Sequence, residues 1–295
     1  MAAEVLDAAI LGAGPAGLSA GIYLARAGLK CTVFSSGPIG GALQEISKIS
    51  NYPGFLGSGP ELAETMKKQA ELAGARIEYG KCTSIKKAEK DGSDTRFMLE
   101  IDGAEILARA VLIASGSEPK TLPFEPSKPV SYCALCDGDL IKDKNVAVIG
   151  GGNSALQEAL YLAGLAKKVT VISHSALRAE QCLQSRAQDA QNMEILEGIE
   201  PTIKLLDGFD HIFVYIGKQP ASGYLRGLDK RILDERGEIL TGEGGQQLHE
   251  TAVSGLFAAG DIRSGAVRQV VTAAADGATS AIEIIDFLKN ADSHP

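Results

Sequence analysis

A unit of one strand, one glycine turn, one helix and a second strand occurs twice in this chain, and it restricts the possible fold more than any other feature. The first copy runs from Leu6 to Ser35 and the second from Asn145 to Ser173. In each copy apolar residues follow a helical spacing between two continuous apolar runs. This order predicts two βαβ units with parallel strands and right-handed crossovers. We therefore expect an α/β protein with two Rossmann-like, three-layer ββα nucleotide-binding domains, one of them inserted into the other.

The glycine turns of the two copies have the spacing that dinucleotides need. They read Gly12-x-Gly14-x-x-Gly17 and Gly150-x-Gly152-x-x-Ala155. The first small residue permits the tight turn, the second lets the backbone approach a pyrophosphate, and the third lets the helix pack closely on the strand. The free N–H groups of the helix N-terminus then face the phosphates. A glycine turn without a nucleotide remains the alternative, but two copies in a strand–turn–helix context favour nucleotide binding.

The end of the second strand in each copy lacks the residue that usually binds an adenosine ribose. An acidic side chain at this offset normally accepts the ribose hydroxyl. Ser35 and Ser173 stand there instead. Neither copy therefore offers a carboxylate to the ribose at this place.

Charge and composition limit the classes of partner. The chain has 295 residues, a net charge of −8 and 22% charged residues, which is typical of a globular protein and unlike a basic nucleic-acid binder. Residues 1–7 are too short and too acidic for a secretory signal, and no apolar run reaches the length of a membrane span. We expect a cytoplasmic protein that binds neither nucleic acid nor membrane.

A cysteine pair lies just before the second repeat. Cys133 and Cys136 are separated by two residues, and Asp137 follows them. A C-x-x-C pair at the start of a helix is typical of thiol–disulfide exchange, and a neighbouring carboxyl can transfer the proton. A zinc site would need two more ligands, but the remaining cysteines and histidines show no ligand spacing. We expect no metal, and an inert pair remains an alternative.

Read with their neighbours, these motifs make the chain similar to the low-molecular-weight thioredoxin reductases from end to end. The matching segments are the first glycine turn with Pro15 and Ala16, Gly40-Gly41, Asn51-Tyr52-Pro53-Gly54, Ala114-x-Gly116, Cys133-Ala-Leu-Cys136-Asp137-Gly138, the second glycine turn, Phe257-Ala258-Ala259-Gly260-Asp261 and Arg268-Gln269.

The resemblance implies a flavoprotein with a discontinuous FAD-binding domain. Residues 1–116 and 246–295 would form that domain, and residues 117–245 a reduced NAD(P)H-type domain that carries the cysteine pair. Cys136 would lie nearer the flavin, Cys133 would attack a thioredoxin-type disulfide, and Asp137 would act as acid and base. The implied FAD-binding residues are Gly12, Gly14, Pro15, Ala16, Gly17, Ser35, Gly40, Gly41, Ala42, Leu43, Asn51, Ala114, Gly116, Gly260, Asp261, Arg268, Gln269 and Val270. Members of this family are homodimers.

Two departures from the family concern the electron donor. NADPH-dependent members carry a His-Arg-Arg cluster and a further arginine after the second strand of the inserted domain, but here Ser173-His174-Ser175-Ala176-Leu177-Arg178 retains one arginine. Between Gln191 and Phe213 there is room for two short strands, where the family has a longer meander. Both features resemble the ferredoxin-dependent flavin thioredoxin reductases. We therefore expect ferredoxin or another non-nicotinamide donor.

Four alternatives remain open from the sequence. The chain could be an NAD(P)H-dependent thioredoxin reductase with a weakened nucleotide site, or an oxygen-dependent dithiol oxidase, which resembles the same family and also lacks the arginine cluster. It could be a redox-sensing module without catalysis, although the intact cysteine pair speaks against this. A second flavin could fill the second nucleotide site.

Overall fold

A computed structural model describes residues 5–46, 48–88, 97–225, 227–242 and 247–292. The chain divides into two compact units. The first comprises residues 1–117 and 220–295, and the second, inserted between them, residues 118–219. Strands β9 (Ser117–Pro119) and β15 (Lys218–Pro220), where the chain passes between the units, pair as a two-stranded sheet.

The larger unit is built on a seven-stranded sheet in the order β5-β2-β1-β8-β7-β6, with β16 paired to β8. The strands β5, β2, β1, β8 and β16 run parallel, while β6, β7 and β8 form antiparallel pairs. The bounds are β1 Val5–Leu11, β2 Cys31–Ser35, β5 Arg76–Tyr79, β6 Cys82–Lys87, β7 Phe97–Ile101, β8 Ala104–Ile113 and β16 Leu256–Ala258.

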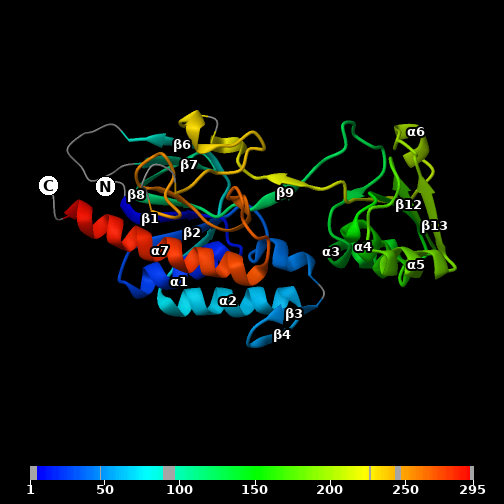
Figure 1. The fold of residues 1–295 in the computed structure, drawn as a ribbon, viewed down its shortest axis with the longest axis horizontal. Coiled ribbons are helices and arrows are strands. Elements are labelled where there is room, and N and C mark those ends of the chain that lie inside the picture. Colours follow the sequence, from blue (N-terminus) through cyan, green and yellow to red (C-terminus); the bar gives the residue numbers. More distant parts are fainter. Residues whose placement is uncertain (1–4, 47, 89–96, 226, 243–246, 293–295) are drawn as a thin grey trace. The chain divides into compact units, whose positions relative to one another are not determined.

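Three helices cover one face of this sheet: α1 (Pro15–Arg26), α2 (Gly59–Ala73) and α7 (Val270–Asp292) (Figure 1). The hairpin of β3 (Ile49–Tyr52) and β4 (Phe55–Gly57) lies beside α2. The inward side chains of β1 and β2 are small or branched, so α1 packs closely on them. One hydrophobic core fills this side, and a second lies between the parallel strands and the antiparallel β6–β7 layer. The unit therefore has the three layers that the repeat predicts.

The boundary after the inserted unit differs from the position expected from the sequence. Residues 220–245 were assigned to the inserted domain, but the chain from 220 onward groups with the larger unit. The physical reason is burial. Leu225, Ile232 and Ile239 are almost fully buried and belong to the core that contains Phe97 and Leu99 of β7.

The inserted unit has a five-stranded sheet that is parallel throughout, in the order β10-β14-β11-β12-β13. Its elements are β10 Val130–Ser131, α3 Ala134–Asp137, β11 Asn145–Ile149, α4 Asn153–Ala163, β12 Lys168–Ser173, α5 Gln181–Asp189, β13 Met193–Glu197, α6 Ile203–Leu206 and β14 His211–Val214.

The two faces of the smaller sheet are covered unequally. Helices α4 and α5 pack over one face around a core that includes Val148, Leu156 and Phe213. The other face has only a small core, with Leu206 of the single-turn helix α6 and the loop residue Phe124. Between Gln191 and Phe213 the chain thus forms the two short strands that its length predicted, β13 and β14, joined by one helical turn.

Among the described residues, no helix combines the length and the apolar character that crossing a membrane requires.

Candidate active site

The first glycine turn is shaped so that only glycine fits at two of its positions. Gly12 has φ +115°, and a Cβ atom there would lie 2.3 Å from the carbonyl oxygen of Ala114 at the end of β8. A Cβ at Gly17 would lie 1.8 Å from the carbonyl oxygen of Gly12, so α1 packs directly on the turn. The turn thereby brings the N-terminus of α1 to the carboxyl ends of the parallel strands, where nucleotides bind in such sheets.

The start of α1 is left open for an anion. Gly14 is the N-cap residue and Pro15 follows it, and no side chain caps the helix. The nearest atom to a Cβ at Gly14 would be the carbonyl oxygen of Gly40, 4.0 Å away. Gly40 in turn donates its N–H to the carbonyl of Ala13 at 2.7 Å, which fixes this loop beside the turn. Uncapped N–H groups beside an open, glycine-lined space fit a pyrophosphate.

The C-terminal part of the chain closes the other side of this turn. A Cβ at Gly260 would approach the Cβ of Ala16 to 3.0 Å, and a Cβ at Gly277 of α7 would approach the Ala16 carbonyl oxygen to 2.0 Å. Gly260 also begins the 3₁₀ turn Gly260–Ile262 that contains Asp261. The two ends of the chain therefore meet at the glycine turn.

Further residues expected at the flavin are paired across the larger unit. Asn51 donates its side-chain N–H to the Gln269 side-chain oxygen at 3.1 Å, although the two are 218 positions apart. Arg268 pairs with Glu238, a buried carboxylate that the motifs did not indicate. Because Glu238 lies in the segment 220–245, its contact with Arg268 explains part of why that segment belongs to the larger unit.

The other residues expected to bind FAD differ in how far they are exposed. Gly41 and Ala42 are exposed, while Leu43, the next residue of the 3₁₀ turn Gly41–Glu45, is buried in the core. Ser35 is also buried, and its hydroxyl donates to the carbonyl oxygen of Gly37 at 2.8 Å. Ser35 therefore stabilises its own turn rather than presenting a free hydroxyl. Ala114, Gly116 and Val270 lie at the ends of β8 and at the start of α7.

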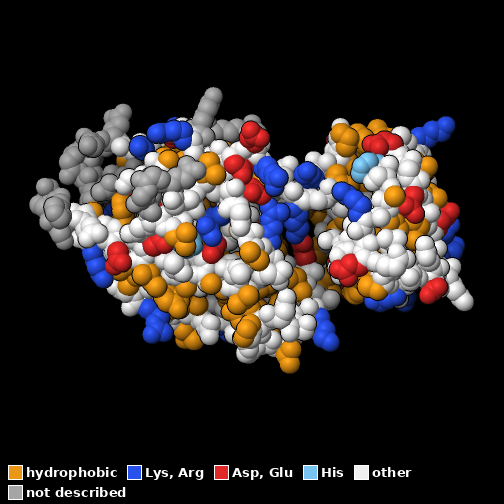
Figure 2. Space-filling model, in the orientation of Figure 1, with side chains coloured by type: hydrophobic (Ala, Val, Ile, Leu, Met, Phe, Trp, Pro, Cys, Tyr) orange, Lys and Arg blue, Asp and Glu red, His pale blue; other side chains and the backbone are white. Residues whose placement is uncertain are grey.

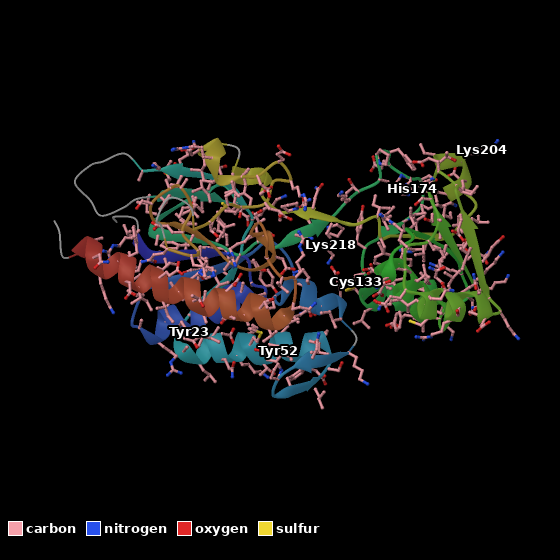
Figure 3. The ribbon with its side chains drawn as sticks, in the orientation of Figure 1. Tyr23, Tyr52, Cys133, His174, Lys204 and Lys218 are labelled. Atoms are coloured by element: carbon pink, nitrogen blue, oxygen red, sulfur yellow. A yellow bond between two sulfur atoms is a disulfide. The ribbon has the colours of Figure 1, made fainter. Side chains whose placement is uncertain are left out.

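The cysteine pair forms a disulfide at the start of α3 (Figure 3). Cys136 is exposed and Cys133 is half-buried. The Cys136 N–H donates to Cys133 Sγ at 3.1 Å, so the sulfur acts as the N-cap of the helix. The N–H of Ala134 donates to the Tyr215 hydroxyl at 2.9 Å, which anchors the helix to the chain that follows β14. Tyr215 is a supporting residue that no sequence motif indicated.

Charged and titratable groups surround the disulfide within its own unit. Asp137 ends α3, is half-buried, and donates its backbone N–H to the Cys133 carbonyl at 3.2 Å. Behind it the buried His211 ring lies 2.7 Å from the Ser131 hydroxyl. Burial and the nearby Lys144 lower the pKa of His211, against an opposing effect of Asp137. A neutral imidazole therefore lies behind the helix.

The second glycine turn repeats the geometry of the first. Gly150 has φ +140°, and its Cβ would lie 2.3 Å from the Tyr215 carbonyl oxygen. A Cβ at Gly151 would lie 2.4 Å from Ser173 Oγ. Gly152 is the N-cap of α4 without a side-chain cap, and a Cβ there would meet no atom within 4 Å. This turn retains the shape of a nucleotide-binding loop.

A carboxylate of the neighbouring strand β13 lies against the loop that would contact the adenosine end of a nucleotide. The Leu177 N–H donates to Glu197 Oε2 at 2.8 Å, and Glu197 pairs with Ser173 in the strand register. The Arg178 N–H donates to the Gly151 carbonyl at 2.7 Å, which holds the loop against the turn. The sequence indicated the missing arginines, but not that Glu197 on the neighbouring strand would reach this loop.

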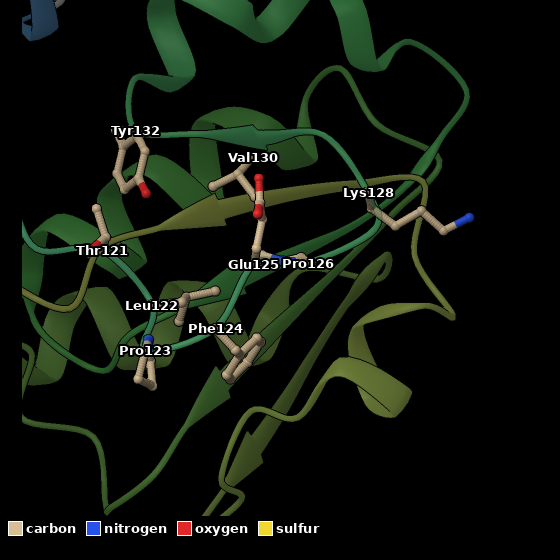
Figure 4. Close-up of a pocket in the computed structure, with 9 residues that line it drawn as sticks. All are labelled: Thr121, Leu122, Pro123, Phe124, Glu125, Pro126, Lys128, Val130 and Tyr132. Carbon is tan, nitrogen blue, oxygen red and sulfur yellow. The ribbon is translucent and has the colours of Figure 1, made fainter.

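A cavity of about 580 Å³ lies on the thinly covered face of the smaller sheet (Figure 4). It is lined by the chain between Thr121 and Tyr132, with apolar side chains beside Glu125 and Lys128. Its last lining residue, Tyr132, directly precedes Cys133. Within the described residues, no group of three or more acidic, histidine or cysteine side chains is placed to hold a metal ion.

Comparison with known proteins agrees with this geometry. The pyridine nucleotide-disulphide oxidoreductase family matches residues 6–277. The chain therefore belongs to this family, whose thioredoxin reductases are FAD-binding, flavin-dependent disulfide oxidoreductases. The expectations of an α/β fold, of an enzyme and of FAD as cofactor are confirmed.

Within the family, the relatives are low-molecular-weight thioredoxin reductases. The chain is 36% identical to the thioredoxin reductase of Bacillus subtilis over 313 residues, which covers 97% of this chain and 96% of the relative. The crystal structure of Lactococcus lactis thioredoxin reductase, in the conformation named FR, superposes with a TM-score of 0.80 at 32% identity, covering 97% of this chain and 99% of that one. The crystal structure of T. acidophilum thioredoxin reductase gives a TM-score of 0.78 at 30% identity, covering 96% of this chain and 98% of that one.

Proposed function

We propose that this protein reduces the disulfide of a thioredoxin or a thioredoxin-like protein, with electrons from a donor other than NADPH, such as ferredoxin. The observation that carries the proposal is the Cys133–Cys136 disulfide, exposed on one side and followed by Asp137. The relatives named thioredoxin reductases support the choice of acceptor.

The larger unit is proposed to hold FAD. The uncapped start of α1 and the glycines around it would bind the pyrophosphate, and Asp261 would face the ribityl chain. Asn51 and Gln269, already joined by a hydrogen bond, would line the ring. When bound, FAD supplies the electron pair that converts the disulfide to two thiols.

The reduced cysteine pair would then carry out thiol–disulfide exchange. The Cys136 N–H that donates to Cys133 Sγ would stabilise a thiolate there, because a hydrogen bond to an anion is stronger than one to a neutral thiol. Cys133 would attack one sulfur of the partner disulfide, and Cys136 would then displace the partner thiolate. The enzyme disulfide forms again, and the partner gains two electrons and two protons.

Asp137 is the proposed acid and base of this exchange. It would accept the proton of the attacking thiol and return it to the sulfur that leaves. Its position at the end of the same short helix keeps the carboxyl next to the pair in sequence and in space. The neutral His211 behind the helix contributes no competing charge.

The choice of donor rests on the adenosine loop of the inserted unit. A 2′-phosphate is usually held by several charge-assisted hydrogen bonds, each worth about 1.5–3 kcal/mol. Here Arg178 is the one cation retained from the cluster, and the Glu197 carboxylate lies against the loop. This arrangement disfavours NADPH.

Lysines and exposed apolar side chains of the inserted unit support a protein partner. Lys167 donates its backbone N–H to the Lys144 carbonyl, so these two lysines lie next to one another directly before β11 and β12, and Lys142 precedes Lys144 by two residues. Tyr161 and Leu165 of the α4 end lie over Gly138, directly after the pair, and both are exposed. An acidic protein such as ferredoxin or thioredoxin would find complementary charge there.

Two alternatives keep the same flavin and disulfide. The nucleotide-loop shape of the turn at Gly150–Gly152 favours a residual nicotinamide site, and the missing arginine cluster is equally compatible with an oxygen-dependent dithiol oxidase.

Anaerobic flavin reduction by NADPH, NADH and reduced ferredoxin, compared side by side, distinguishes these alternatives from the proposed function. We expect ferredoxin alone to reduce the flavin fast enough for turnover. Turnover with NADPH at an equal rate would overturn the choice of donor, and oxygen uptake with dithiols alone would favour the oxidase.

We also propose a homodimer through the larger unit. A groove of about 1030 Å³ between α1, α2 and the β3–β4 hairpin is lined largely by apolar side chains, including Tyr23 and Tyr52. Tyr23, Leu56 and Leu72 are exposed on the same elements. Tyr23 and Tyr52 are labelled in Figure 3, and apolar side chains gather on this part of the surface in Figure 2. Exposed apolar patches of this kind usually mark an interface. Sedimentation of the holoprotein as a monomer at micromolar concentration would contradict the proposal.

A further inference from the structure

A buried histidine in the larger unit lies between two carboxylates of α7. His249 is 1% exposed. Its Nδ1 lies 2.9 Å from Glu283 Oε1, and its Nε2 lies 3.5 Å from Asp276 Oδ1. The backbone N–H of His249 also donates to Glu283 Oε2 at 2.9 Å. Both the side chain and the backbone of His249 are thus held by α7.

This geometry favours a charged imidazole. A carboxylate can only accept hydrogen bonds, so Nδ1 must carry a proton to bond Glu283. In a neutral ring Nε2 would then present its lone pair to Asp276, which is repulsive inside a buried site. Only the imidazolium offers an N–H to both carboxylates. At 3.5 Å the Nε2 contact is a charge contact rather than a well-formed hydrogen bond.

The surrounding charges agree with a protonated histidine. Burial lowers the pKa of His249, but the bonds to Asp276 and Glu283 more than offset it and the net shift is upward, with Arg263 opposing. The pKa of Asp276 is lowered, because His249 and Arg263 outweigh the effect of burial. Glu283, Asp276 and Arg263 are the charged groups that face the ring, from α7 and from the chain after the Gly260 turn.

The same cluster reaches the turn expected to contact FAD. Asp276 Oδ2 accepts the N–H of Gly260 at 3.2 Å and the Nε–H of Arg263 at 3.0 Å. The Ala258 N–H donates to the His249 carbonyl at 2.9 Å, so β16 is held just before that turn. The neighbouring residue of Asp276 is Gly277, which presses against the start of α1. A change at His249 is therefore transmitted through one carboxylate to the Gly260–Asp261 turn.

We propose that His249 is a positioning residue for FAD, and that its proton, shared between Asp276 and Glu283, holds the Gly260–Asp261 turn in the shape that binds the cofactor. The proposal rests on FAD binding by the larger unit and is independent of the electron donor and of the thioredoxin partner. It makes cofactor retention dependent on pH.

The direction of the pH dependence follows from the two shifts. A histidine whose pKa is raised on folding stabilises the structure fully below its unfolded pKa, about 6.5, and loses that contribution as the pH rises through the higher folded value. The lowered pKa of Asp276 gives a contribution that is lost only as the pH falls well below about 3.8. FAD should therefore be held most tightly in mildly acidic solution and less tightly above neutral pH.

The test compares FAD release from the purified holoprotein at pH 5.5, 7 and 8.5, followed by flavin fluorescence and by equilibrium titration of the apoprotein with FAD. The variants are His249→Gln, which keeps one donor without charge, and Glu283→Gln. Asp286→Asn is the matched control, because Asp286 is an exposed acid on the same helix. The wild type and the control should lose affinity by about tenfold over this range, the size of a modest coupling between one proton and FAD binding.

His249→Gln should bind FAD about tenfold more weakly at pH 5.5 and show a flat pH profile. A purely structural role would lower the melting temperature of this variant but leave the slope of its FAD affinity against pH unchanged. Retention of the wild-type slope by His249→Gln would overturn the proposal, as would a wild-type FAD affinity that does not change between pH 5.5 and 8.5. Loss of thioredoxin reduction with this FAD profile intact would instead count against the proposed function alone.

Discussion

At the scale of single residues, the disulfide helix places three groups with different tasks within five positions. Cys133 accepts a backbone hydrogen bond at its sulfur, Cys136 is exposed, and Asp137 is half-buried at the helix end. A second acid, Asp139, is exposed only two residues further on. The two acids differ in burial and in sequence distance from the cysteine pair. Substituting each in turn therefore distinguishes a specific role of Asp137 from a general effect of negative charge.

Replacing Asp137 by Asn should slow thioredoxin reduction by about 10²-fold, the usual size of a general acid–base contribution. The flavin spectrum and the FAD content should stay as in the wild type, because the larger unit is unchanged. Steady-state reduction of thioredoxin with a saturating donor measures the effect, with Asp139→Asn as control. Equal loss in both variants would show that Asp137 has no special role.

The residues that could be predicted from the sequence are those that belong to local motifs. Gly12 needs glycine because its φ is positive in the turn, and Gly17 because its Cβ would strike the backbone of Gly12. Glu238 and His249 escaped prediction because their partners Arg268 and Glu283 lie 30 and 34 positions away. Nothing in the local sequence distinguishes a buried carboxylate from a surface one.

At the scale of elements, the contact between α7 and α1 ties the C-terminal helix to the glycine turn. A Cβ at Gly277 would lie 2.0 Å from the backbone oxygen of Ala16, and backbone cannot move aside as a side chain can. The close approach of α7 to α1 is needed because α1 must start directly at the first glycine turn. The position of α7 should therefore affect nucleotide binding at that turn.

Gly277→Ala should lower the free energy of unfolding by roughly 1–3 kcal/mol, in spite of the better helix propensity of alanine. It should also weaken FAD binding, because α1 would be displaced. Ala275→Gly, at an exposed position of the same helix, should cost about 1 kcal/mol and leave FAD binding unchanged. Urea unfolding and FAD titration measure both. A Gly277→Ala protein as stable as the wild type would contradict this account of the packing.

The loop between β12 and α5 is the element that sets the proposed preference against NADPH. His174 and Ser175 lie in the stretch after β12 where the family has its arginine cluster, and the loop backbone is fixed by Gly151 and Glu197. A fixed loop should accept new side chains without rearrangement. Tight NADPH binding, which the missing arginines would supply, should therefore be restored by substitution.

The double variant His174→Arg with Ser175→Arg should bind NADPH at least about tenfold more tightly than the wild type, since each arginine adds one charge-assisted contact to the 2′-phosphate. NADH, which lacks that phosphate, serves as the control ligand and should bind as before. Anaerobic flavin reduction at varied nucleotide concentration gives both affinities. An equal gain for NADH would show that general charge attraction, and not the clamp, is responsible.

The order of elements was predictable because the spacing of apolar residues and of glycines in each βαβ unit indicates its strands and its helix. Helices α1 and α4 begin directly after the two glycine turns, where the repeat predicts them. The end of the inserted unit was not predictable, since the described residues between 220 and 242 contain few regular elements. Only burial against β6 and β7 shows that Leu225 and Ile232 belong to the larger unit.

At the scale of the whole molecule, the proposed FAD site and the disulfide are built on different compact units. The larger unit contains the glycine turn of α1 and the Gly260–Asp261 turn, while the smaller unit carries Cys133 and Cys136. Each unit has its own cores. Electron transfer between the two proposed sites would require both units in one chain.

The central claim is that the flavin and the Cys133–Cys136 pair exchange electrons within this protein. Anaerobic titration of the holoprotein with dithionite tests it most directly, with flavin absorbance and free thiols followed together. The wild type should take up four electrons per chain, two by the flavin and two by the disulfide, and the Cys133→Ser, Cys136→Ser double variant only two. Uptake of only two electrons by the wild type, with a bleached flavin and no new thiols, would contradict it.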